Sequence, residues 1–185
     1  MYEYRRDKTT FDVVDLDPYG TAIPFLEGAI MSLANNGLLC VTFTDMAVLC
    51  ARAPHVCFYK YGAAPLAKAY CHEQALRMVL YTINTIANKQ SKRVEPLLSL
   101  TVDFYIRLFI RVKTAPIDCH QSIRKYSHIH QCTFCESFYL QPLGEAVPVR
   151  EKKRMTKAAK KAAKKNPAAA QEAEQEELKE ATASG

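Results

Sequence analysis

The chain has 185 residues, 49% of them hydrophobic, so it can bury the core of one domain or of two small ones. No apolar run reaches the roughly 20 residues of a membrane span, and the polar start resembles no signal peptide, so we expect neither a membrane nor a secreted protein. The seven cysteines, an odd number, favour a reduced intracellular protein over a disulfide scaffold. The net charge of +6 comes mostly from residues 150–185, where ten Lys or Arg outnumber six Asp or Glu.

The first predicted elements are a strand, a helix and a second strand, within about 35 residues. The strand covers residues 11–16, the helix 24–35 with Asn36-Gly37 as its stop signal, and the second strand 38–43. This succession predicts two parallel strands joined by a right-handed crossover.

The rest of the chain is less regular. Residues 46–65 predict a long loop with one short helix, and residues 66–89 give the clearest helical pattern. Residues 97–112 predict one long strand, or two with a bend, and 115–145 look irregular. Tyr59, Lys60 and Tyr61 combine charge and aromatic faces as RNA contacts do, and a partly buried loop would look the same.

Acidic and hydroxyl side chains follow both strands of the predicted unit. Asp17 comes after the first strand, and Thr44-Asp45 come directly after the second. Ligands bind at the carboxyl ends of parallel strands, so we expect these residues to face one crevice. Asp45 fits a role as cap of the following helix equally well.

Asp17-Pro18-Tyr19-Gly20 combines residues suited to methylating an exocyclic amine of a nucleobase. Such an amine is a poor nucleophile because its lone pair is delocalised into the ring. The Asp17 carboxylate can accept one amine N–H and the Pro18 carbonyl the other, in a loop that proline stiffens. Tyr19 offers a stacking face, and Gly20 permits a close turn. A plain turn has the same composition, so the loop alone leaves both interpretations open.

Further motifs follow this loop in a fixed order. They are FDVVDLDPYG at 11–20, GLLCVTFTDMAVLC at 37–50, YKYG at 59–62, CHEQALR at 71–77, PLLSLTVDFYIR at 96–107, QCTFC at 131–135 and FYLQPLG at 138–144. Together they closely resemble the eukaryotic tRNA (guanine-26 N2)-dimethyltransferases over residues 10–145.

The resemblance implies an enzyme that uses S-adenosyl-L-methionine to add two methyl groups to N2 of a guanosine in tRNA. Asp17 would be the base and hydrogen-bond acceptor, Pro18 would offer its carbonyl, and Tyr19 would contact the base. Gly20, Thr44 and Asp45 would line the substrate pocket. The expected partner is tRNA, with no DNA and no membrane.

The implied fold class is α/β, in three parts. Residues 1–65 would be the C-terminal part of a Rossmann-like class I methyltransferase domain, 66–148 part of an α+β C-terminal domain, and 149–185 a disordered charged tail. The family's glycine-containing cofactor motif and ribose-binding acidic residue precede the Asp17 loop, and only ten residues precede Phe11 here. The cofactor-binding residues are therefore unknown, and we expect a fragment inactive by itself. The alternative is a non-catalytic tRNA- or RNA-binding remnant.

Cys132 and Cys135 form half of a zinc site, because a structural zinc ion takes four ligands. The resemblance suggests a second cysteine pair downstream, which this chain lacks. His128, His130 and Cys119 are nearby substitutes, and two unligated thiols are the alternative.

Residues 150–165 carry nine Lys or Arg and one Glu. Such a cluster can serve as a nuclear address and add weak affinity for tRNA, or be a solvated linker. We expect a nuclear protein, with the cytoplasm and the mitochondrion as alternative locations.

Overall fold

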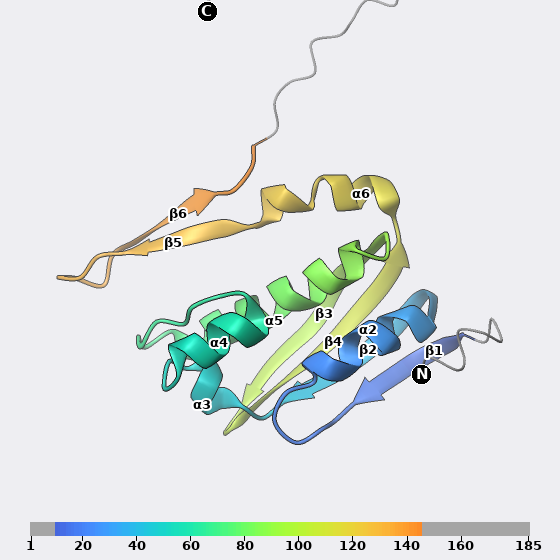
Figure 1. Cartoon of the computed structure of the whole chain (residues 1–185), viewed down its shortest axis with the longest axis horizontal. Coiled ribbons are helices and arrows are strands. Elements are labelled where there is room, and N and C mark those ends of the chain that lie inside the picture. Colours follow the sequence, from blue (N-terminus) through green and yellow to red (C-terminus); the bar gives the residue numbers. More distant parts are fainter. Residues whose placement is uncertain (1–9, 146–185) are drawn as a thin grey trace, which may run out of the picture. The chain divides into compact units, whose positions relative to one another are not determined.

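The computed structural model describes residues 10–145, which belong to one compact unit of the chain (Figure 1). Its elements, in chain order, are β1 (Phe11–Leu16), α2 (Ile23–Ser32), β2 (Leu33–Phe43), α3 (Met46–Leu49), α4 (Pro54–Tyr61), α5 (Cys71–Asn88), β3 (Lys92–Val102), β4 (Tyr105–Thr114), α6 (Pro116–His120), the 3-10 turn η1 (Ser122–Lys125), β5 (Ser127–Gln131) and β6 (Phe138–Pro142). No helix among these has the length and apolar character required to cross a membrane. The predicted charged tail lies outside the described residues.

A four-stranded mixed sheet with the order β1-β2-β4-β3 is the centre of the fold. β1 and β2 are parallel and are connected through α2, which confirms the predicted strand-helix-strand unit and the α/β fold class. β4 runs antiparallel to both β2 and β3. The domain boundary predicted after residue 65 remains a prediction. The four-stranded sheet contains strands from both sides of residue 65, since β2 precedes this residue and β4 follows it.

Helices α2 and α5 lie along one face of this sheet (Figure 1). The burial pattern of β4 explains why the helices cover one face of the sheet. Its residues alternate between fully buried and half-buried, so one face of the strand points into the core. The core side chains from both layers are Leu39, Val41 and Phe43 of β2, Ile106, Leu108 and Ile110 of β4, Leu26 and Ile30 of α2, and Val79 and Ile83 of α5.

The first helix ends earlier than predicted. α2 stops at Ser32, and β2 begins at the next residue, so Asn36-Gly37 is not a helix stop. The two residues lie instead in an irregular start of β2, where the register to β1 shifts and Asn36 has a φ of 70°. An Asn-Gly pair supplies positive φ in either setting, so the sequence signal was ambiguous.

Of the predictions for residues 66–112, the start of the helix needs a correction, whereas the strand prediction left two alternatives that the structure decides. α5 starts at Cys71 rather than at residue 66, because the preceding segment is held by a hydrogen bond from the Leu66 N–H to the Gln74 side chain (2.9 Å). For residues 97–112 the second predicted alternative, two strands with a bend, is the observed one: they belong to the hairpin of β3 and β4, which turns at Asp103, where φ is 45°. Pro96 is accommodated in β3 because β3 is an edge strand with a register shift there.

Two segments are more ordered than predicted. Residues 46–65 contain two short helices rather than one; α4 begins with Pro54 and ends at the left-handed Gly62, which are ordinary start and stop signals. The expectation that 115–145 is irregular was wrong: α6, η1 and the β5–β6 hairpin form there. The pairing of β5 with β6 was not predicted, because the loop that contains Cys132 and Cys135 separates these two short strands in the sequence.

Candidate functional site

The Asp17-Pro18-Tyr19-Gly20 loop leaves the carboxyl end of β1, as predicted. Gly20 has a φ of 77°, a conformation that favours glycine, although a Cβ there would meet no atom within 4 Å. Tyr19 is fully exposed (103%), so its ring is free to stack on a base. No hydrogen bond or ion pair found among residues 10–145 engages the exposed Asp17 carboxylate.

Thr44, at the end of β2, holds this loop in place. The Gly20 N–H donates a hydrogen bond to Thr44 Oγ1 (2.7 Å), and the Thr44 N–H donates one to the Gly20 carbonyl (2.9 Å). The structure thus brings the ends of β1 and β2 together, as the parallel arrangement predicted. The Thr44 hydroxyl is engaged by the loop itself.

Asp45 is oriented by a buried tyrosine. The Tyr61 hydroxyl lies 2.7 and 2.9 Å from the two Asp45 carboxylate oxygens and 2.9 Å from Thr21 Oγ1. Lys60 Nζ adds an ion pair at 3.6 Å. Burial raises the pKa of Tyr61 far above its ordinary value, so the hydroxyl stays protonated and donates. Asp45 occupies the N-cap position of α3 without a side-chain cap bond, so its carboxylate serves this network instead.

Arg107 supports the same region from the neighbouring strand β4. Its guanidinium donates to Asp15 Oδ2 of β1 (2.7 Å) and to Thr42 Oγ1 of β2 (2.6 Å), and so ties three strands together. The hydrogen bond to Asp15 raises the pKa of Arg107, and the charge of nearby Asp17 adds to this effect. Sequence reasoning missed Arg107, because only the antiparallel register of β4 shows that it lies beside the loop.

Tyr59 and Tyr61, which the sequence could not assign, lie in different surroundings on α4. Tyr61 is 1% exposed and belongs to the Asp45 network, whereas Tyr59 is 72% exposed. Two hollows of about 370 and 300 Å³ adjoin Arg93 and Asp118 near α6, and neither includes a residue of the Asp17 loop.

Cys132 and Cys135 lie in the loop between β5 and β6. The N–H groups of Phe134 and Cys135 point to Cys132 Sγ at 3.4 and 3.5 Å, so the loop turns around this sulfur. A hydrogen bond with Ser137 lowers the pKa of Cys135. Within residues 10–145 these two sulfurs join no third Cys, His, Asp or Glu ligand, and the zinc half-site remains a prediction.

Comparisons with known proteins test the resemblance carried by this loop. The family model for "N2,N2-dimethylguanosine tRNA methyltransferase" matches residues 1–181. Curated relatives named tRNA (guanine(26)-N(2))-dimethyltransferase are 51% identical in Drosophila melanogaster and 47% identical in Mus musculus, over 80% and 79% of this chain. The chain spans 26% and 22% of the length of these two relatives.

A solved structure agrees with the sequence comparison. Trm1 from Pyrococcus horikoshii, solved in complex with S-adenosyl-L-methionine, is 30% identical and superposes with a TM-score of 0.71. The match covers 79% of this chain and 40% of the archaeal chain, and it supports the α/β methyltransferase fold. The resemblance stated from the motifs is confirmed: the chain belongs to the N2,N2-dimethylguanosine tRNA methyltransferase family.

Proposed function

We propose that this chain carries the base-binding loop of an S-adenosylmethionine-dependent tRNA (guanine-26 N2)-dimethyltransferase. The proposal rests on the conformation of this loop. Thr44 holds its backbone by a hydrogen bond with Gly20, and Tyr19 is fully exposed. Among the described residues, none forms a hydrogen bond or ion pair with the Asp17 carboxylate, which leaves it available to a ligand. Family membership supports the reaction class. The names of the relatives support guanine 26 as the target.

The chemistry begins with the exocyclic amine of guanine. Asp17 accepts one N2–H and the Pro18 carbonyl accepts the other, which orients the amine and lowers the delocalisation of the nitrogen lone pair into the ring. S-adenosylmethionine, when bound, supplies an electrophilic methyl group. As the bond from N2 to the methyl carbon forms, the carbon–sulfur bond of the donor would break and leave a neutral thioether. Positive charge grows on N2 in this step, and the negative Asp17 carboxylate stabilises it. The proton that N2 then loses passes to Asp17, and a second round needs the same alignment of the remaining N–H.

Tyr19 and the residues behind the loop have different tasks in this scheme. A guanine inside a tRNA helix must leave its stack to reach Asp17, and the exposed Tyr19 ring replaces part of the lost stacking. Gly20, Thr44 and Asp45, which we expected to line the substrate pocket, act as positioning residues. Their hydrogen bonds run within the protein: Gly20 and Thr44 bond to each other, and Asp45 bonds to Tyr61.

The residues present fit one side of a methyl-donor site. The carboxyl ends of β1 and β2 converge at the loop, where ligands of such sheets bind. Neither hollow noted above adjoins Asp17, and the cofactor-binding residues of this chain are unassigned. We therefore expect the isolated chain to bind S-adenosylmethionine weakly or not at all in calorimetric titration.

A chimera tests the proposed function. The segment of the Drosophila melanogaster relative that matches this chain is replaced by this chain's residues, which are 51% identical over 148 positions. The chimera should form dimethylguanosine in a tRNA transcript, detected by mass spectrometry of nucleosides, and no product in a transcript with adenosine at position 26. A folded chimera that binds tRNA and forms no product would instead favour the non-catalytic RNA-binding alternative.

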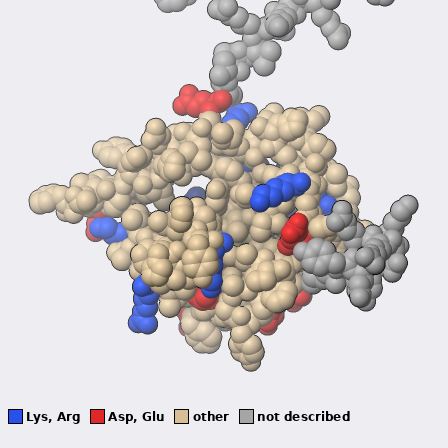
Figure 2. Space-filling model, in the orientation of Figure 1, with Lys and Arg blue, Asp and Glu red and all other residues tan. Residues whose placement is uncertain are grey.

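Contacts to tRNA outside the loop are proposed for the basic cluster 150–165. On the face shown in Figure 2, the Lys and Arg side chains of the described residues are scattered rather than gathered in one patch. The cluster lies outside the described residues, and its nine basic side chains suit phosphate contacts and a nuclear address. One curated relative, from Saccharomyces cerevisiae, is named as mitochondrial. Deleting 150–165 should shift a tagged chain out of the nucleus, and an unchanged distribution would refute this address.

A further inference from the structure

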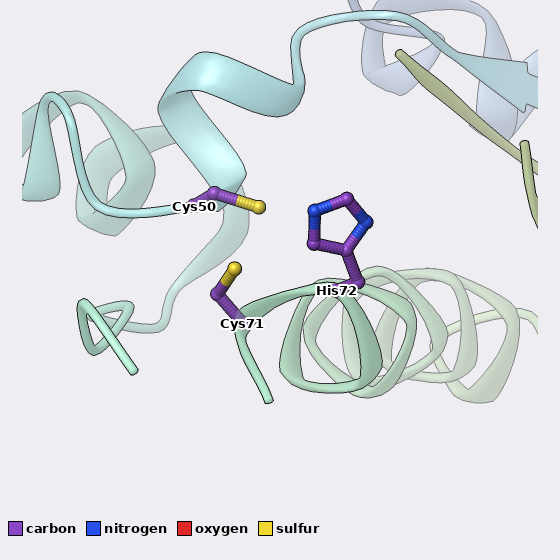
Figure 3. Close-up of side chains that lie close together, drawn as sticks. All are labelled: Cys50, Cys71 and His72. Atoms are coloured by element: carbon purple, nitrogen blue, oxygen red, sulfur yellow. The ribbon is translucent and has the colours of Figure 1, made fainter. Parts of the chain in front are cut away.

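Two cysteines and a histidine converge at the end of α3 and the start of α5. Cys50 follows the last residue of α3, and Cys71 and His72 are the first two residues of α5. One ligand atom from each lies within 4.8 Å of the other two, and the side chains point toward a common centre (Figure 3). Within residues 10–145, this is the one group of three Cys, His, Asp or Glu side chains with such spacing.

The donor set has a clear chemical preference. Two thiolates and an imidazole are ligands that Zn²⁺ binds in tetrahedral sites. Bond lengths near 2.3 Å to sulfur and 2.0 Å to nitrogen place two sulfurs and one nitrogen roughly 3.5–3.8 Å apart in a tetrahedral site. The ligand atoms of Cys50, Cys71 and His72 lie within 4.8 Å of one another, so they need to approach by only about 1 Å to bind one ion.

The surroundings suit a bound cation with one open position. Cys71 is the first residue of the 18-residue helix α5, whose N-terminal turn anchors both Cys71 and His72 on one rigid element. Cys50 and Cys71 are half-buried, whereas His72 is exposed. Water can therefore reach the side of the cluster that the protein leaves uncovered and complete the coordination.

We propose that Cys50, Cys71 and His72 bind one Zn²⁺ ion, with water as the fourth ligand. The ion would link the end of α3 to the start of α5. Since α3 begins directly after Asp45, the link would fix the segment that positions the Asp17 loop. This site is separate from the Cys132/Cys135 pair and does not depend on the proposed methyltransferase activity.

The test uses the full chain carrying Cys132→Ser and Cys135→Ser, so that the hairpin pair cannot contribute. After reduction and removal of metal, the protein is titrated with Co²⁺ and then with Zn²⁺. We expect one equivalent of Co²⁺ with the absorption of tetrahedral cobalt bound to thiolate, displaced by one equivalent of Zn²⁺. Cys50→Ser or Cys71→Ser should abolish this absorption, and the matched control Cys119→Ser should leave it unchanged.

His72→Gln keeps the test decisive if a cysteine variant fails to fold. His72 is exposed, so this variant should keep its circular dichroism spectrum and bind Zn²⁺ at least tenfold more weakly. The proposal is overturned if the folded parent shows no tetrahedral cobalt spectrum, or if its affinity is unchanged by His72→Gln. Formation of a Cys50–Cys71 disulfide in place of metal binding, seen as two missing free thiols, would also overturn it.

Discussion

Gly20 and Thr44 exchange two hydrogen bonds in opposite directions, although 24 residues separate them in the sequence. Each residue donates its N–H to the other, one to a side-chain oxygen and one to a carbonyl. The pair fixes the Asp17 loop against the end of β2 before any ligand arrives. Catalysis by alignment requires such preorganisation, because a misplaced acceptor loses much of its effect.

Replacing Thr44 by valine tests the contribution of its hydroxyl. Thr44→Val keeps the shape but leaves the Gly20 N–H without its acceptor (2.7 Å), so we expect about 1 kcal/mol lower unfolding free energy. Urea denaturation of the chain measures this. Thr44→Ser, which retains the hydroxyl, is the control and should stay near the parent. Equal stability of the valine variant and the parent would show that the hydrogen bond does not hold the loop.

Tyr61 offers a second test, with a control on the same helix. Tyr61→Phe removes a buried hydrogen bond to the Asp45 carboxylate and should lower the unfolding free energy by about 2 kcal/mol. Tyr59→Phe removes an exposed hydroxyl and should have no measurable effect. Both are compared by urea denaturation at one pH. If the two substitutions had the same effect, Tyr61 would not be anchoring Asp45.

Glu95 provides a pH-dependent test of the β3–β4 hairpin. Lys113 Nζ donates to Glu95 Oε2 at 2.8 Å, and this hydrogen bond lowers the pKa of Glu95. A carboxyl whose pKa is lowered by folding stabilises the folded state above its unfolded pKa, about 4.3. That stabilisation disappears as the pH falls through the folded value. Glu95→Gln should therefore lower the urea midpoint slightly at pH 7, and this effect should become smaller as the pH is lowered through the acid range.

Glu27→Gln serves as the control for this pH dependence, since it removes one exposed negative charge from α2. Its urea midpoint at pH 7 should stay close to that of the parent. A Glu95→Gln effect of the same size at pH 7 and in the acid range would contradict the role assigned to the Lys113 hydrogen bond.

Local signals in the sequence were sufficient for the centre of the fold. The sequence predicted β1, the turn after it and the parallel strand β2. Runs of β-branched residues and the Asp-Pro turn are signals that need only a few neighbouring residues to be recognised. The start of β2 was not predictable, since Asn36-Gly37 suits a helix stop and a strand irregularity equally. The β5–β6 hairpin was missed because its pairing is set between strands, across a loop of cysteines.

In the candidate site, too, neighbouring residues could be predicted from the sequence, whereas residues brought in by long-range contacts could not. Asp17, Pro18, Tyr19 and Gly20 are contiguous, so their chemistry could be inferred from the sequence. Arg107 enters through the register of an antiparallel strand, 92 residues from its partner Asp15. The cluster of Cys50, Cys71 and His72 likewise depends on how α3 and α5 pack. Such long-range contacts leave no periodic pattern in the chain.

The central claim is that Asp17 accepts the amine of the target base. Asp17→Ala in the Drosophila chimera should lower kcat/KM for tRNA methylation by at least about 100-fold, the usual effect of losing a positioned proton acceptor. Asp12→Ala, which removes another exposed acidic side chain from the preceding strand β1, is the control. Binding of tRNA should be unchanged in both variants. If Asp17→Ala kept activity within a few-fold of the parent, another residue would have to align the amine.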